Sequence, residues 1–229
     1  MANEIISYLE MCTREGANLQ RGMNFRMRGD HSVLLMSVRP NAPYADRLED
    51  NGETLIYEGH DVPKTAEYPE PKSVDQPERM PGGSLTQNSL FHEAAQTCKK
   101  NGGAPERVRV YEKLKKGIWS YNGVFHLVDS WLERDDHRKV FKFKLVAIEG
   151  DEDFSRPVRN DLPHRRVIPT WVKLEVWKRD GGKCRECGAT DELHFDHIVP
   201  YSKGGTSITP ENVQLLCARH NLEKRDKII

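Results

Sequence analysis

Apolar residues fall in short runs along most of the chain, which is the pattern of a fold rich in strands. Residues 33–38 (VLLMSV) predict a buried strand, and residues 54–57 predict a second one after the turn signal Asn51-Gly52. Further β-type runs cover residues 107–112, 123–131 and 139–148. Several short strands with few helices between them favour a β-dominated sheet or barrel.

Two segments have a helical pattern instead. Residues 89–100 predict a short helix that ends at Asn101-Gly102-Gly103, and residues 169–179 predict a second helix. A proline-rich stretch at residues 62–83 predicts a long surface loop. The expected fold class is therefore α+β.

A change of composition near residue 150 divides the chain. Its 229 residues exceed the roughly 100–200 of a typical domain. Residues 149–163 are acidic and then interrupted by prolines, which is typical of a linker. We expect a β-rich unit with flanking helices at residues 1–150, a linker at 151–164 and a small second unit at 165–229.

Charge also separates the two units, although the whole chain has a formal net charge of zero. Residues 1–155 hold 21 Lys and Arg against 25 Asp and Glu, a net of −4, whereas residues 156–229 hold 14 against 10, a net of +4. Phosphate attraction should therefore be concentrated in the second unit, unless its charges are only solvated surface. Its basic residues gather at Arg165, Arg166, Lys173, Lys178, Arg179 and Lys183.

The chain has no sign of a membrane segment. No apolar run approaches the roughly 20 residues needed to cross a bilayer, and no basic flank precedes an apolar N-terminal stretch. We expect a soluble, cytoplasmic protein that does not bind a membrane.

Cysteine and histidine spacing predicts a structural zinc site near the C-terminus. Cys184-x-x-Cys187 and Cys217-x-x-His220 are two close pairs, and a tetrahedral zinc site commonly takes its four ligands in this way. The alternative is that these are ordinary buried thiols. An odd number of cysteines without a secretion signal favours metal over disulfides.

The residues around these pairs resemble the HNH nuclease family, whose small unit has a ββα-metal fold. The resemblance covers about residues 165–229 and includes both ligand pairs. The other residues that carry it are Asp196-His197-Ile198-x-Pro200, Gly204-Gly205, Asn212-x-x-Leu215-Leu216-Cys217 and His220-Asn221-x-x-Lys224. It implies a metal-dependent DNA endonuclease, which hydrolyses phosphodiester bonds.

The resemblance also implies roles for four residues. Phosphodiester hydrolysis needs a base that deprotonates water and a cation that neutralises charge on the phosphoryl oxygens. His197 is then the general base, while Asp196 and Asn221 supply the oxygen ligands that Mg²⁺ or Mn²⁺ prefers. Asn212 would hold the long loop so that His197 points correctly.

Neighbouring positions leave alternatives open. Many family members have Cys-x-x-Cys-His where this chain has Cys-x-x-His-Asn, so we assign His220 to zinc and Asn221 to the catalytic cation. His194 is expected to pack near the site, with a catalytic role as the less favoured alternative. Arg219 either contacts the scissile phosphate or lies on a solvated helix face.

The first unit resembles the SRA (or YDG) domain, which binds DNA containing 5-methylcytosine. The resemblance covers about residues 20–150 and is looser than the HNH resemblance. It rests on Tyr57-Glu58-Gly59, Leu85-Thr86-Gln87-Asn88-Ser89-Leu90, Pro105-x-Arg107-Val108-Arg109-Val110, Trp119-Ser120-Tyr121-Asn122-Gly123-Val124-Phe125, Val128-Asp129-Ser130-Trp131 and Val140-Phe141-Lys142-Phe143-Lys144-Leu145. The family's Tyr-Asp-Gly appears here as Tyr121-Asn122-Gly123.

In SRA domains the methylated base is flipped out of the duplex and lies between two aromatic rings, with a carboxylate on its polar edge. Flipping costs a few kcal/mol, and stacking returns roughly 1–3 kcal/mol per base. The resemblance implies Tyr44 and Tyr57 as the rings and Asp46 as the carboxylate, with Asp50 as a rival because the spacing differs by one residue. A tyrosine in a β-rich unit more often packs in the core, which is the role we assign to Tyr121.

Together the resemblances predict a bacterial modification-dependent endonuclease, similar to the type IV restriction enzymes directed against methylated DNA. It would bind double-stranded DNA at a modified cytosine and cut nearby with a single catalytic metal ion, and a homodimer would allow double-strand cleavage. One alternative is a non-catalytic reader of modified DNA, but an intact set of HNH residues argues against it. The other is an HNH endonuclease that does not depend on modification, and the aromatic pair with its carboxylate argues against that.

Overall fold

The computed structural model describes residues 3–27, 29–135, 137–148, 167–200, 203–225 and 227–228. The linker expected at residues 151–164, together with Arg165 and Arg166, lies outside these residues, so the domain boundaries stay a prediction. The N-terminal unit is residues 3–148, and the C-terminal unit is residues 167–228.

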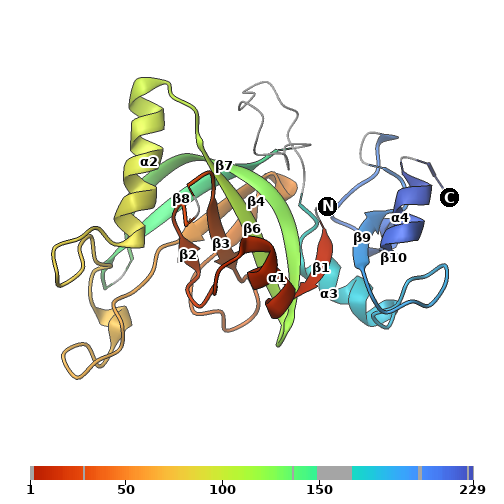
Figure 1. The fold of residues 1–229 in the computed structure, drawn as a ribbon, viewed down its shortest axis with the longest axis horizontal. Helices are drawn as coiled ribbons and strands as arrows, with labels where there is room; N and C mark the ends of the chain where they lie inside the picture. Colours follow the sequence, from red (N-terminus) through yellow and green to blue (C-terminus); the bar gives the residue numbers. More distant parts are fainter. Residues whose placement is uncertain are drawn as a thin grey trace.

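The elements follow the chain in an order that mixes strands and helices (Figure 1). They are β1 (Glu4–Ser7), α1 (Tyr8–Glu15), β2 (Met23–Asn24), β3 (Ser32–Met36), β4 (Arg47–Glu49), η1 (Asp50–Gly52), β5 (Thr54–Glu58), η2 (Pro71–Ser73), α2 (Gln87–Asn101), β6 (Glu106–Lys115), β7 (Ile118–Arg134), β8 (Lys139–Ala147), α3 (Thr170–Arg179), β9 (Leu193–His197), η4 (Pro210–Asn212), β10 (Val213–Cys217) and α4 (Ala218–Lys224). The expected α+β class is confirmed.

The predicted elements are present with shifted ends. The five apolar runs became β3, β5, β6, β7 and β8, and the two helical patterns became α2 and α3. Helix α2 begins where the Thr86 side chain accepts a hydrogen bond from the backbone of Ser89, and it ends at Gly102 in the left-handed conformation. Among the described residues, no helix is long and apolar enough to cross a bilayer.

One branched sheet runs through both units. Its main path has the order β10-β9-β1-β7-β6-β3-β2, and the branch continues from β7 through β8 and β5 to β4. Strand β7 is at the branch because β6 pairs with its residues 118–127, whereas β1 pairs with residues 118–121 and β8 with residues 125–134. Figure 1 shows the short β1 between the long β7 and the C-terminal hairpin of β9 and β10.

Three apolar clusters hold the layers together. The largest lies between the N-terminal sheet and α2, which contributes Phe91 and Ala95. A second packs α1 against the sheet through Met11. The third contains the apolar residues of α3, β9 and β10, and it also includes Leu114 from β6. The core of the C-terminal unit is therefore continuous with the N-terminal sheet.

Candidate nuclease and base-binding sites

The four predicted zinc ligands lie together. Cys184 and Cys187 come from the turn after α3, Cys217 ends β10, and His220 lies in the first turn of α4. Their ligand atoms are all within 4.8 Å of one another. A tetrahedral ion with Zn–S bonds of about 2.3 Å has S···S edges of about 3.8 Å. The Cys187 Sγ and Cys217 Sγ atoms are 3.8 Å apart, so the spacing fits a zinc ion.

His220 turns its Nδ1 atom toward this cluster. The Nδ1 atom lies 3.4 Å from both Cys184 Sγ and Cys217 Sγ. Burial alone would raise the pKa of the Cys184 thiol, but hydrogen bonds from the backbone of Cys217 and Cys187 and from His220 lower it to about 6. A thiolate is the metal-binding form of cysteine. The Cys-x-x-His-Asn register therefore places His220, rather than Asn221, among the sulfur ligands.

The β9–β10 hairpin positions the candidate catalytic pair. Asp196 lies opposite Gln214 across the hairpin, and Gln214 Nε2 donates to Asp196 Oδ2 at 3.2 Å. The buried Lys224 Nζ lies 3.0 Å from the same oxygen and donates to the backbone oxygen of His197 at 2.7 Å. Lys224 thus fixes the end of β9 from α4, while the second carboxylate oxygen of Asp196 can serve a cation.

Helix α4 also carries Asn221, three residues before Lys224. Residues three apart lie on the same face of a helix. Because Lys224 contacts Asp196, this spacing puts Asn221 on the side of α4 that faces the end of β9. Aspartate and asparagine oxygens are suitable ligands for Mg²⁺ or Mn²⁺.

Asn212 holds the loop that follows His197. Its Oδ1 accepts from the backbone of Val199 at 2.8 Å, and its Nδ2 donates to the backbone oxygens of Val199 at 3.1 Å and Thr206 at 2.9 Å. Gly205 is part of this arrangement, because a Cβ atom there would lie 1.8 Å from the Val199 oxygen. The geometry is the one expected of a residue that orders the loop.

The His197 ring is oriented by Ser207, which comes from the far end of the same loop. The His197 Nε2 and Ser207 Oγ atoms are 2.9 Å apart, and Ser207 is buried. Ser207 and Lys224 both contact the candidate catalytic pair, and neither was predicted from the sequence. Only the spacing Asn221-x-x-Lys224 signalled one of them.

His194 and Arg219, for each of which the sequence left two roles open, lie beside the site. His194 is buried where β9 pairs with Glu4 of β1, and burial lowers its pKa even though the nearby Glu4 opposes that shift. This placement agrees with packing rather than catalysis. Arg219 is exposed, and its guanidinium lies 3.3 Å from His220 Nε2, on the far side of the ring from the sulfur atoms.

The predicted base-binding residues share one cavity in the N-terminal unit. The cavity has a volume of about 660 Å³, and Tyr44, Asp46 and Tyr57 all line it. Tyr57 is buried and Tyr44 is half-buried. Asp50, the rival carboxylate, instead accepts a hydrogen bond from Thr54 Oγ1 at 2.8 Å. The cavity therefore favours Asp46 over Asp50.

Asp46 is held by backbone donors at the cavity wall. Its Oδ2 accepts from Ser37 N at 3.0 Å and its Oδ1 accepts from Glu58 N at 3.1 Å. Burial raises the pKa of Asp46 to about 7, although these two hydrogen bonds oppose the rise. Each carboxylate oxygen keeps a second lone pair that can accept from a ligand.

His60 is a third aromatic ring in the cavity, and the sequence analysis missed it. Its ring stacks on Tyr44 with centroids 5.2 Å apart, and its Nε2 lies 3.1 Å from the Tyr57 hydroxyl. Burial lowers the pKa of His60 to about 4, so the ring is neutral at pH 7. Its place directly after Tyr57-Glu58-Gly59 was the available signal.

The predicted basic cluster of the C-terminal unit needs a correction. Lys173 is fully buried and pairs with Glu112 of β6, so it cannot attract phosphate from the surface. Arg179 binds Asp180 and the backbone oxygens of Pro210 and Val213. Both side chains serve the packing of α3. Lys178 and Lys183 are exposed, as expected.

Comparison with known proteins gives matches for both units. Residues 184–227 match the family model for HNH endonuclease. A comparison with curated proteins gave no match. Among solved structures, the chain is similar to the SUVH5 SRA domain in complex with hemimethylated CG DNA, at 24% identity and a TM-score of 0.46, over 66% of this chain and 89% of that chain.

Two further structures are similar over more of the chain. One is the modification-dependent TagI restriction endonuclease, at 19% identity and a TM-score of 0.43, over 97% of this chain and 76% of that chain. The other is Arabidopsis thaliana SUVH6 in complex with SAM, at 17% identity and a TM-score of 0.43, over 86% of this chain and 31% of that chain.

The family match covers the zinc ligands and every predicted catalytic residue. The C-terminal unit is an HNH endonuclease domain, and the prediction of a nuclease is confirmed.

Proposed function

We propose that this chain is a modification-dependent DNA endonuclease that flips a 5-methylcytosine-type base into its N-terminal cavity and cuts the DNA nearby with its HNH domain. The observation that carries the proposal is the cavity itself, in which Tyr57 of β5 meets Tyr44 and Asp46 from the segment before β4.

The composition of the cavity supports base binding. Pockets for small ligands usually measure about 300–1,000 Å³ and combine apolar walls with a few polar groups. Tyr44 offers an aromatic face, and the Asp46 carboxylate can accept a hydrogen bond from the amino group of cytosine. Arg21, Arg39 and Lys113 also line the cavity, where they can attract the phosphates that flank a flipped nucleotide.

The HNH residues can divide the hydrolysis among them. His197, oriented by Ser207, accepts the proton of the attacking water. Asp196 and Asn221 hold a divalent cation, which neutralises charge on the phosphoryl oxygens and the leaving 3′-oxygen when it is bound. Lys224 keeps the Asp196 carboxylate in place.

Two metals of different kinds fit the two sets of ligands. The sulfur-rich set of three cysteines and His220 suits a structural Zn²⁺. The oxygen donors Asp196 and Asn221 suit Mg²⁺ or Mn²⁺. Because a single active site cuts one strand, we propose that two copies of the chain cooperate in cutting a duplex.

Matched duplexes test the proposal. Three duplexes of one sequence carry cytosine, 5-methylcytosine or 5-hydroxymethylcytosine at one position and are incubated with the protein and Mg²⁺ or Mn²⁺. We expect cleavage near the modified base and little cleavage of the unmodified duplex. Equal cleavage of all three would favour a nuclease that ignores modification, and modified-site binding without any cleavage would favour a non-catalytic reader.

A further inference from the structure

A buried ion pair joins the two units. Lys173 of α3 and Glu112 of β6 are both fully buried, and the Lys173 Nζ and Glu112 Oε2 atoms are 2.7 Å apart. Lys173 Nζ also donates to Asn122 Oδ1 of β7 at 2.6 Å, and Thr170 Oγ1 of α3 donates to Glu112. These four side chains form one polar network within the protein interior.

Asn122 suits this network because an amide can both accept and donate. Its Oδ1 accepts from Lys173 while its Nδ2 donates to Glu112 Oε2 at 3.0 Å. An aspartate at this position could not donate, and it would set two buried carboxylates against one ammonium group. Buried charge without a matching partner is strongly unfavourable. The SRA signature Tyr-Asp-Gly has an aspartate where this chain has Asn122. The neutral amide leaves Glu112 as the one carboxylate that pairs with the Lys173 ammonium of α3.

The network lies within a larger contact between the units. Strand β1 pairs with both β7 and β9, and Phe195 N donates to the backbone oxygen of Asn3 at 3.0 Å. At the start of the C-terminal unit, Val167 N donates to the Gly52 oxygen at 2.9 Å. Gly52 has a φ of +93°, and a Cβ atom there would lie 2.1 Å from the Val167 oxygen. These contacts hold the two units together at the edge of the sheet and at the start of the C-terminal unit.

We propose that the Glu112–Lys173–Asn122 network fixes the HNH domain at one orientation on the N-terminal unit, so that DNA is cut at a set distance from the base that is read. The proposal rests on the proposed function. Apolar packing is non-directional and would tolerate small shifts of α3 over β6. A buried, hydrogen-bonded charge pair accepts only one arrangement, so its main contribution here is orientation.

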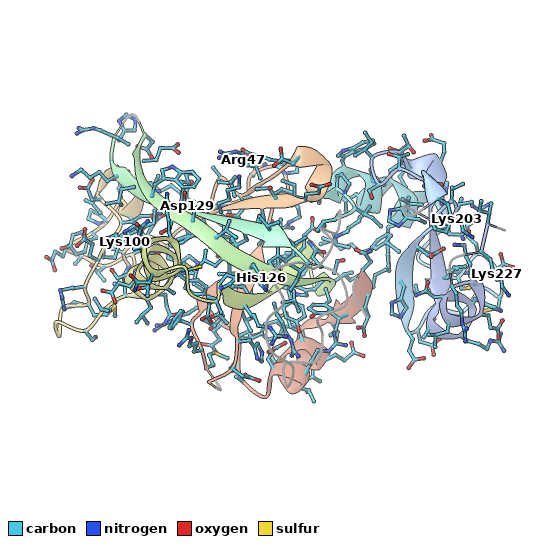
Figure 2. All side chains as sticks on the ribbon, turned by 90° about the horizontal axis from the view of Figure 1, so that it is seen from above. Arg47, Lys100, His126, Asp129, Lys203 and Lys227 are labelled. Atoms are coloured by element: carbon cyan, nitrogen blue, oxygen red, sulfur yellow. The ribbon has the colours of Figure 1, made fainter. Side chains whose placement is uncertain are left out.

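A map of cut positions tests the inference. The double variant Glu112→Gln/Lys173→Met removes both charges and nearly keeps the side-chain volumes. The control variant Lys99→Met/Asp129→Asn removes a surface ion pair of 2.8 Å between α2 and β7, and Figure 2 shows Asp129 in the part of the molecule away from the HNH domain. On end-labelled duplexes with one 5-methylcytosine, we expect the parent and the control to cut in a narrow window. The double variant should still require the modification but cut over a window broader by about twofold or more.

A second measurement does not depend on cleavage. In calorimetry the parent should unfold in one transition, whereas the double variant should show two, because its units no longer unfold together. If the double variant does not fold, Thr170→Val removes only the α3 hydroxyl that donates to Glu112, and it should separate the transitions in the same direction.

The outcomes separate the two proposals. An unchanged window with a single transition in the folded variant would overturn the fixed orientation. A parent that cuts without regard to modification, or not at all, would sink the proposed function instead, and the calorimetry would still decide the orientation.

Discussion

The rings of Tyr44 and His60 stack with centroids 5.2 Å apart and planes 22° apart, so a flat base has no room between them in this structure. His60 is fixed, because its backbone nitrogen and oxygen both bond to the Asn88 side chain, at 2.8 and 2.9 Å. Tyr44 is half-buried and is held from outside by Lys72, whose Nζ lies 5.2 Å from the ring centroid. Of the two tyrosine rings proposed to hold the base, Tyr44 is therefore the more accessible.

This arrangement makes Tyr44→Ala the cleanest test of the cavity. The variant should lose stacking of roughly 1–3 kcal/mol, or about 5- to 150-fold in affinity for the methylated duplex. Binding to unmodified DNA should hardly change, because it depends mainly on phosphate contacts. Competition binding at one salt concentration measures the ratio of the affinities for methylated and unmodified duplexes. Tyr44→Phe is the control, because it keeps an aromatic ring.

If Tyr44→Ala keeps the parent's ratio of affinities for methylated and unmodified duplexes, the base binds elsewhere. Tyr57→Ala is a weaker test. Tyr57 is buried in the main core, and truncation of a large buried aromatic ring costs about 3–5 kcal/mol of stability.

Asp46 should make recognition depend on pH. Its pKa is about 7, and only the ionised carboxylate can accept from the cytosine amino group with both oxygens. Affinity for the methylated duplex should therefore rise between about pH 6 and pH 8. Asp46→Asn should bind more weakly and lose this pH dependence. A parent whose affinity ratio is flat across this range would contradict the assignment.

The same pKa has the opposite effect on folding. The folded protein keeps the Asp46 proton between its unfolded pKa of about 3.9 and its folded value of about 7. The contribution of Asp46 to the free energy of unfolding therefore falls as pH rises through that range. Affinity and this stability term change in opposite directions, so a rise in affinity cannot be a by-product of better folding.

His197→Ala should separate cutting from binding. The residue acts on water in the HNH domain, whereas the modified base lies in the other unit, so cleavage should disappear while affinity for methylated DNA stays within about twofold. Ser207→Ala keeps the imidazole but removes its 2.9 Å contact, and it should cut slowly. Loss of binding in His197→Ala would show that the two sites are not independent.

Zinc should be required for the folded C-terminal unit. Structural zinc contributes on the order of 10–16 kcal/mol in small zinc modules, so Cys184→Ser and Cys217→Ser should give misfolded or insoluble protein. Metal analysis of the purified parent should find one zinc ion per chain. The half-buried Cys98, which is not one of the four ligands, is changed to Ser as the control. A soluble, active Cys184→Ser protein that contains no zinc would contradict the assignment of a structural zinc site.

Local pattern was sufficient for much of the fold. Strands β6 and β8 alternate polar with apolar residues over many positions, and the zinc ligands have a characteristic spacing, so both were visible in the sequence. Strand β1 was not, because Glu4–Ser7 is too short to show a pattern and is a strand only through its pairing with β7 and β9.

Contacts between distant segments could not be predicted in the same way. Lys173 has the pattern of a surface charge on α3, and only the fold brings Glu112 to it. His60 and Lys224 had recognisable neighbours in the sequence, but their roles depend on which rings and carboxylates the fold places beside them.

In the proposed function, the N-terminal cavity directs the HNH domain to modified DNA. The most direct measurement uses methylated and unmodified duplexes, labelled differently, in one tube with Mg²⁺, and compares their initial cleavage rates for the parent and for Tyr44→Ala. We expect that the parent strongly favours the methylated duplex and that Tyr44→Ala brings the ratio of the two rates toward one. A parent ratio near one, or an undiminished ratio in Tyr44→Ala, would contradict it.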